Sequence, residues 1–261
     1  MSSYVLPREV APGIFWLGEC HLQRYNDRLL HSYNSAFLVT GDDASLIVDT
    51  GHLVHLPIIE AQLDLLLTDA PPLRWSWTTH QETPHSGGVG RLMTKFPELT
   101  LIGDVRDHHL FFPGYEDRFE RRKVGDSVDL GGTEFQIVDA TIKDLNGTQW
   151  GFDTARKVLF AGDGFCYGHY HTDDACGHLV EEVPGVEIAE HTKLFSEFSL
   201  HWMTLVPMAP YVEALQRQVA ALDVSLVCST HGLPFSDLDR TANEVYRGML
   251  ASGLEGLDLK A

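Results

Sequence analysis

One short loop of the sequence carries side chains that could bind a metal. His80, Glu82 and His85 lie close together, directly after the apolar run 73–79. A loop that leaves a strand can turn several side chains toward one point. Imidazole and carboxylate groups are suitable ligands for iron, manganese or zinc. The cluster therefore predicts a metal site, whereas each histidine taken alone is also typical of a polar loop that faces water.

Two more candidate ligands follow apolar runs farther along the chain. Asp163 lies between Gly162 and Gly164, two glycines that would let the backbone approach a bound ion closely. His231 follows the run SLVCST. Each pattern on its own is more typical of an ordinary turn, so the two residues become candidate ligands only together with the first cluster.

The elements that must position these residues alternate along the chain. Periodicity and turn residues predict an α/β protein in which helices pack on sheets, as a single domain over residues 1–261. Three candidate ligands, His80, Asp163 and His231, then fall just after strands. The predicted strands are residues 35–40, 45–49, 73–79, 99–103, 134–139, 148–152, 157–161 and 225–230, and the predicted helices are 56–67, 89–96, 210–222 and 240–251.

The order of these motifs resembles the metallo-β-lactamase fold family. SLIVDTG is followed by H-x-E-x-x-H, then a strand ending in GD, then STHG. The resemblance implies an αββα sandwich that holds one or two metals at the edge between its sheets. Glutamate at the second ligand position is similar to the flavodiiron branch, which holds two irons. Stretches such as SYNSAFLV and VGDSVDLGG look like the same branch.

The resemblance also implies roles for individual residues. His80, Glu82, His85 and His231 match metal ligands, and Asp163 matches a carboxylate that bridges the two metals. Asp49 matches a buried aspartate that supports the site without binding metal, although a cap or turn role is the alternative.

Two positions depart from the family pattern. Pro84 stands where the family has a ligating aspartate, and Asp144 stands where it has a histidine. Asp144 can bind a hard cation through oxygen, or it can merely shape the turn before Asn146 and Gly147. The expected division places one metal on His80, Glu82 and Asp144 and the other on His85 and His231, with Asp163 between them. Such a carboxylate-rich set favours iron, with manganese or zinc as alternatives.

Two further histidines are candidate catalytic residues, which could act as acid–base groups or as hydrogen-bond donors behind the metal ligands. His169 follows the bridging aspartate by a few residues, and His201 corresponds roughly to an aromatic residue near the metals of the relatives. The alternative for both is an ordinary loop or helix histidine.

The function implied by the resemblance is that of a non-haem di-iron redox protein that binds O₂. It would act as an oxidoreductase or oxygenase on a small organic substrate, or use a separate electron donor. No bound flavin is expected, because no stretch of the sequence matches a flavodoxin-like domain. The alternatives are a binuclear hydrolase of esters, lactones or thioesters and an O₂ sensor without turnover. A homodimer is compatible with the resemblance.

Charge and cysteine usage limit the partners and the compartment. The chain has 19 basic and 37 acidic residues, a net charge of −18. This excess argues against nonspecific binding to nucleic acid or to an anionic membrane. The N-terminal residues contain no apolar core of a signal peptide, and no apolar run is long enough to span a bilayer. Four cysteines without a C-x-x-C pair favour a reducing cytoplasm.

Overall fold

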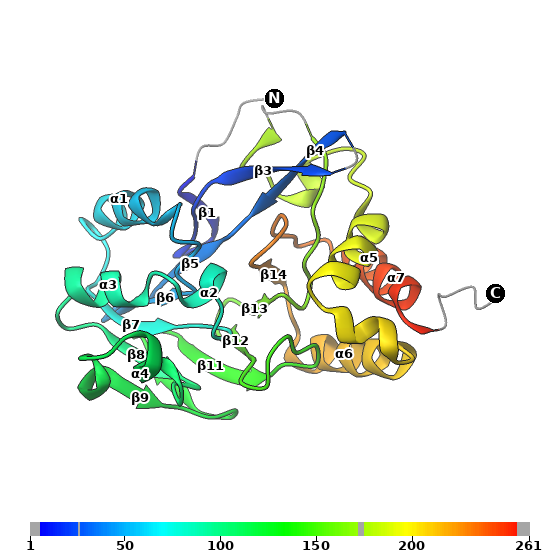
Figure 1. Cartoon of the computed structure of the whole chain (residues 1–261). Coiled ribbons are helices and arrows are strands. Elements are labelled where there is room, and N and C mark those ends of the chain that lie inside the picture. The colour runs from blue at the N-terminus through cyan, green and yellow to red at the C-terminus, as the bar shows by residue number, and fades with distance from the viewer. Residues whose placement is uncertain (1–5, 26, 172–174, 255–261) are drawn as a thin grey trace.

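The computed structural model describes residues 6–25, 27–171 and 175–254, and two packed sheets form its centre (Figure 1). The larger sheet has seven strands in the order β1-β2-β5-β6-β7-β8-β9. Its strands are β1 (Arg8–Ala11), β2 (Ile14–Leu17), β5 (Ala36–Thr40), β6 (Ser45–Val48), β7 (Leu73–Trp77), β8 (Thr100–Gly103) and β9 (Phe119–Arg121).

The second sheet has five strands in the order β10-β11-β12-β13-β14, and a separate hairpin joins β3 to β4. The last two strands of the five-stranded sheet, β13 and β14, run parallel. The bounds are β10 (Ser127–Asp129), β11 (Glu134–Asp139), β12 (Gln149–Asp153), β13 (Val158–Gly162) and β14 (Leu226–Ser229), with β3 (Cys20–Tyr25) and β4 (Arg28–Tyr33) in the hairpin.

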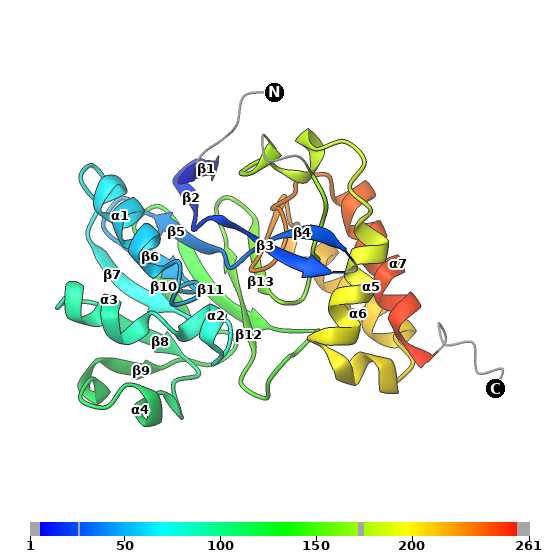
Figure 2. The same cartoon turned by 45° about the horizontal axis from the view of Figure 1, so that its top comes forward.

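Helices cover the outer faces of both sheets, as Figures 1 and 2 show. Helices α1 and α3 lie over the seven-stranded sheet, and α5, α6 and α7 lie at the opposite side of the molecule. This arrangement confirms the predicted αββα sandwich. None of the described helices is long and apolar enough to cross a membrane. The helices are α1 (Leu56–Leu66), α2 (Thr83–Ser86), α3 (Val89–Lys95), α4 (His108–Phe111), α5 (Ile188–Phe198), α6 (Ala209–Leu222) and α7 (Asn243–Ser252), with short turns η1 (Glu116–Arg118), η3 (Val180–Glu182), η4 (His201–Leu205) and η5 (Leu238–Ala242).

The central strands are buried on both faces, and their side chains alternate between two cores. On β5, Phe37 and Val39 pack into the core between the sheets, whereas Leu38 packs into the core under α1 and α3. Successive side chains of a strand point to opposite faces, so a continuous apolar run is what such a strand requires. The predicted central strands are confirmed for this reason.

Some elements differ from those expected. The strand predicted over 73–79 ends at Trp77, because the N–H of Thr79 leaves the ladder and donates to the Asp49 carboxylate over 2.8 Å. The predicted last helix starts as a π-helical turn and continues as α7. The β3–β4 hairpin and α5 were not predicted.

Loops from both sheets lie at the same edge of the sandwich. β6 and β7 are parallel in the larger sheet, and β13 and β14 are parallel in the smaller one. Carboxyl ends of neighbouring parallel strands lie at the same edge of a sheet. The sheets are also joined there, because the N–H of Gln149 donates to the carbonyl of Thr79 over 2.9 Å. The loops after β6, β7, β13 and β14 therefore meet at one place.

The turn after β13 is tightly packed and gives a test of the fold. A Cβ added to Gly164 would lie 2.1 Å from Cζ2 of the buried Trp150. We expect Gly164→Ala to lower the free energy of unfolding by about 1–3 kcal/mol, as overpacking of a core typically does. Urea unfolding measures the change. Gly168→Ala is the control, because its nearest side-chain atom, on Leu30, lies 3.6 Å away. Equal midpoints for the two variants would contradict this packing.

Candidate metal centre

The loop after β7 brings two histidines into the interior. His80 follows the strand directly and is 3% exposed, while His85 lies in the one-turn helix α2 and is fully buried. Pro84 occupies the first turn of α2, where proline is preorganised for a helix and has no N–H to lose. Pro84 thus helps to form the turn that carries His85.

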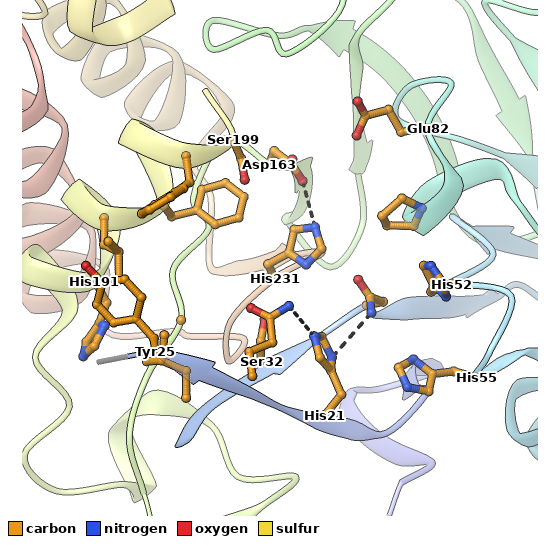
Figure 3. Close-up of a pocket in the computed structure, with 18 of the residues that line it drawn as sticks. His21, Tyr25, Ser32, His52, His55, Glu82, Asp163, His191, Ser199 and His231 are labelled. Atoms are coloured by element: carbon orange, nitrogen blue, oxygen red, sulfur yellow. Dashed lines mark hydrogen bonds and ion pairs between the residues drawn. The ribbon is translucent and has the colours of Figure 1, made fainter. Parts of the chain in front are cut away.

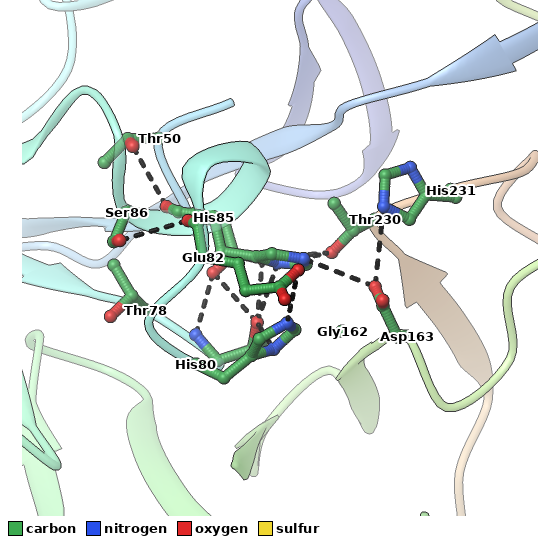
Figure 4. A network of polar contacts seen from close by, with 12 residues as sticks. Thr50, Thr78, His80, Glu82, His85, Ser86, Gly162, Asp163, Thr230 and His231 are labelled. Atoms are coloured by element: carbon green, nitrogen blue, oxygen red, sulfur yellow. Dashed lines mark hydrogen bonds and ion pairs between the residues drawn. The ribbon is translucent and has the colours of Figure 1, made fainter. Parts of the chain in front are cut away.

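Asp163 lies opposite this loop, at the end of β13 (Figure 4). Its Oδ1 is 3.3 Å from Nε2 of His85 and 3.6 Å from Nε2 of His231. The preceding Gly162 has a φ of 51°, and a Cβ there would be 3.0 Å from the side chain of Thr79. A glycine is therefore suited to this crossing of the β7 and β13 loops.

The remaining two candidates approach His80. Its Nε2 lies 3.5 Å from Oδ2 of Asp144 and 3.9 Å from Oε2 of Glu82. Two ligands that each lie about 2.1 Å from an ion, at angles near tetrahedral, are roughly 3.4 Å apart. The observed separations are close to this value. Three overlapping groups could each hold an ion: His80, Glu82 and His85; His85, Asp163 and His231; His80, Asp144 and Asp163.

The ring nitrogens that face away from the cluster are held by the protein. Nδ1 of His85 donates to Asp49 over 2.8 Å, and Nδ1 of His231 donates to the carbonyl of Tyr33 over 2.6 Å. These contacts direct each Nε2 toward Asp163. Nε2 of His80 and Nε2 of His85 are buried and make no hydrogen bond to any described residue. Buried imidazole nitrogens without a hydrogen bond, facing carboxylates, fit a bound metal ion.

Asp49 organises the cluster from behind. Besides His85, its carboxylate accepts hydrogen bonds from the N–H and hydroxyl of Thr79 and from the hydroxyl of Thr230, the last over 3.0 Å. Asp49 itself has a φ of 53°, a conformation that aspartate tolerates better than most residues. Four donors from two loops, those after β7 and β14, therefore hold one buried carboxylate in place.

Burial and neighbouring charges shift the pKa values of the cluster in opposite directions. Burial, together with His85, lowers the pKa of His80 to about 3. Burial also opposes charge on His85, but Asp49 and Asp163 outweigh it and raise its pKa to about 10. Burial, Asp163 and Glu82 raise the pKa of Asp144 to about 7. The cluster is thus crowded with carboxylates that bound cations would neutralise.

For Asp163 and His231, burial and mutual attraction compete. Burial favours the neutral carboxyl of Asp163, but His231 and His85 outweigh it and lower its pKa. Burial lowers the pKa of His231, and the opposing influence of Asp163 does not compensate. A neutral His231 beside an ionised Asp163 is the protonation state that metal binding requires.

A cavity of about 810 Å³ opens onto the cluster (Figure 3). Glu82, Asp144, Asp163 and His231 contribute to its lining, so the cluster lies at one wall of the cavity. Polar and aromatic residues of the β3–β4 hairpin, the β6–α1 loop and α5 form much of the rest, including His21, Tyr25, Ser32, His52, His55, His191 and Phe195.

The structure does not bring His169 or His201 to this cluster. His169 is fully buried, and its ring lies beside those of Tyr33 and His171, with centroid distances of 6.2 and 4.7 Å. His201 begins η4, is exposed, and its Nδ1 lies 3.4 Å from the carbonyl of Glu197. Neither residue lines the cavity. The positions of His169 and His201 in the sequence suggested that both lie near the metals. In the structure, the chain carries both side chains away from the metal cluster.

Sequence reasoning missed the two threonines that hold Asp49. Thr79 precedes His80 and Thr230 precedes His231, so a Thr-His pair ends both β7 and β14 segments. In each pair the threonine hydroxyl donates to Asp49 and the histidine reaches the candidate metal cluster. The repeated pair is the signal that could have identified them.

Known proteins resemble the chain in sequence and in fold, although no family model matches it. A putative diflavin flavoprotein A 2 from Synechocystis sp. is 29% identical over 209 residues, 77% of this chain and 33% of that protein. An anaerobic nitric oxide reductase flavorubredoxin from Vibrio vulnificus is 26% identical over 255 residues, 91% of this chain and 48% of that protein.

Solved structures show the same architecture. The crystal structure of the flavodiiron protein from Giardia intestinalis superimposes with a TM-score of 0.71 at 15% identity, covering 97% of this chain and 59% of that one. The chain spans between about a third and three fifths of the length of these proteins. Sequence and fold together identify the chain as a relative of the flavodiiron proteins with the fold of their metallo-β-lactamase-like core.

Proposed function

We propose that the chain is a non-haem di-iron redox protein that binds O₂ at two metals. The observation that carries the proposal is the convergence of six side chains from four loops beside one cavity, which four of them line. The proposed ligands are His80, Glu82, His85, Asp144, Asp163 and His231, with Asp163 shared between the metals because its Oδ1 faces two imidazoles.

The composition of the ligand set supports iron. It has three imidazoles and three carboxylates, and two divalent cations would leave a charge of about +1. Oxygen ligands suit iron or manganese, and a zinc hydrolase of this fold would offer more imidazole. Bound iron would supply the redox chemistry with O₂. The relatives include a protein named as a nitric oxide reductase, which supports a redox role over hydrolysis.

The cavity supports an organic substrate. Its volume of about 810 Å³ is within the ~300–1,000 Å³ typical of small-molecule sites, and far exceeds what a diatomic gas needs. Histidines 21, 52 and 55 line it with aromatic side chains of α5, so it offers both polar and apolar contacts. The electrons that reduce O₂ would come from the organic substrate or from a separate electron donor.

The remaining parts of the proposal follow the sequence expectations. We propose a single domain, which is supported by a core that includes residues of both sheets and of α5, α6 and α7. A reducing, cytoplasmic location is supported by the free thiols of the four cysteines. Neither nucleic acid nor a membrane is a proposed partner, and a homodimer is proposed and can be tested by mass in solution.

Metal content and visible absorption test the proposed function directly. Protein reconstituted with ferrous iron without oxygen should bind about two irons per chain and change its visible spectrum on exposure to air. O₂ consumption should then depend on a reductant or an oxidisable substrate. Colourless, zinc-loaded protein that cleaves a thioester or lactone would overturn the redox proposal. A spectral change without any turnover would instead indicate a sensor.

The role of Asp144 has its own test. We expect Asp144→Ala to lower the iron content from about two to about one per chain, because only His80, Glu82 and the shared Asp163 would then hold that ion. Asp139→Ala is the matched control, since Asp139 precedes the same loop and pairs with Lys143 at the surface. Full iron content in Asp144→Ala would make Asp144 a turn residue and remove it from the ligand set.

Asp49 should act on the metals through His85. Asp49→Asn removes the negative charge that accepts from Nδ1 of His85, and such outer partners typically contribute 10–100-fold to metal affinity. We expect a loss of about that size in competition with a chelator. Asp129→Asn, on the exposed edge of β10, is the control. Unchanged affinity would show that the threonines alone orient the site.

A further inference from the structure

A second cluster of metal-binding side chains lies apart from the proposed di-iron site. It consists of Cys20 on β3, His31 on β4, and His171 and Cys176 from the segment between β13 and η3. One ligand atom from each residue lies within 4.8 Å of all the others. Two thiols and two imidazoles gathered at one point form a ligand set typical of structural zinc.

The separations fit one tetrahedral ion. Sγ of Cys20 is 3.1 Å and Sγ of Cys176 is 3.8 Å from Nδ1 of His31, and the rings of His31 and His171 are 3.9 Å apart. With Zn–S near 2.3 Å and Zn–N near 2.05 Å, tetrahedral geometry places sulfur and nitrogen ligands about 3.6 Å apart. The cluster therefore needs only small side-chain movements to close around an ion.

We propose that Cys20, His31, His171 and Cys176 bind one zinc ion that ties the β3–β4 hairpin to the segment after Asp163. On binding, each thiol releases a proton to solvent, and two thiolate sulfurs and two neutral imidazoles form four bonds to zinc. Four protein ligands leave no open position, so this ion is structural.

The backbone already holds the two segments together at this point. The N–H of His31 donates to the carbonyl of His169 over 2.8 Å, and the reverse bond measures 3.0 Å. The N–H of Gly177 donates to the hydroxyl of Tyr33 over 2.8 Å. Ligands attached to such a fixed scaffold lose little conformational entropy when they bind an ion.

The position of the cluster gives it a role in the cavity. His21 and Ser32 are cross-strand partners in the hairpin, and both line the cavity (Figure 3). Cys20 and His31 are their immediate neighbours along β3 and β4, so they lie on the opposite face of the hairpin. Zinc would therefore support the cavity wall from behind without touching substrate.

A reactive cysteine is a poorer explanation of the cluster. Burial and the neighbouring Cys176 raise the pKa of the Cys20 thiol, whereas reactive cysteines have lowered pKa values and electropositive surroundings. All four cysteines are free thiols in the structure. A disulfide between Cys20 and Cys176 is the remaining competitor, and the experiment below detects it.

Zinc content of the full chain tests the proposal. Wild-type protein that is first loaded with iron at the proposed di-iron site, then incubated with zinc and desalted, should keep about one zinc per chain, and Cys20→Ser and Cys176→Ser treated in the same way should lose it. Cys228→Ser is the matched control, because Cys228 is buried in β14 and belongs to no metal-binding group. Asp163→Ala should lose the di-iron metals but keep this zinc, which separates the two sites.

Cobalt substitution supplies a second readout. Cobalt bound at this cluster should show thiolate-to-metal absorption that disappears in Cys20→Ser and persists in Cys228→Ser. If the serine variants fail to fold, His171→Gln, which keeps both thiols, should still weaken zinc binding in competition with a chelator. Zinc retained by iron-loaded Cys20→Ser, no zinc in the iron-loaded wild type, or a mass two hydrogens lower from a Cys20–Cys176 disulfide would each overturn the proposal.

Discussion

The carboxylate of Asp49 connects the two sheets at the edge where the metal cluster lies. It accepts hydrogen bonds from Thr79 and His85 in the loop after β7 and from Thr230 after β14. A buried carboxylate is costly unless it is well paired, and here it has donors on several sides. The loops that carry the candidate ligands therefore cannot move independently, because each movement would leave this charge without partners.

Without bound cations, the carboxylates of the cluster that Asp49 supports repel one another, and two of its imidazole nitrogens have no hydrogen-bond partner among the described residues. Asp144 and Asp163 both belong to the group around His80, and burial, together with their mutual repulsion, raises the pKa of Asp144. Buried Nε2 atoms of His80 and His85 make no hydrogen bond within the described part of the chain. Functional sites often contain side chains that destabilise the fold until a ligand binds and satisfies them. Two metal ions would satisfy both the carboxylates and the imidazoles.

The fold could be predicted where each strand forms its own apolar pattern. β5, β6, β13 and β14 are short runs buried on both faces, and turn residues bound them. The β3–β4 hairpin could not, because its buried positions include His31 and Ser32 and the apolar alternation is lost. His201 was misplaced for a related reason: Met203 of the same turn packs into the core, and this leaves His201 exposed.

The residues of the candidate site likewise fall into those that the sequence could identify and those that it could not. The sequence alone determined the cluster of His80, Glu82 and His85, because their spacing within one loop makes their proximity a local property. It also determined the strand ends that carry Asp163 and His231. The resemblance pointed to Asp144 as a ligand beside His80 but left a role in the turn open. Only the tertiary structure places Asp144 3.5 Å from His80 and brings Cys20 and His31 to His171 and Cys176, since those contacts join segments far apart in the chain. Pairing of strands and loops across the sheets brings such residues together, and no local spacing records it.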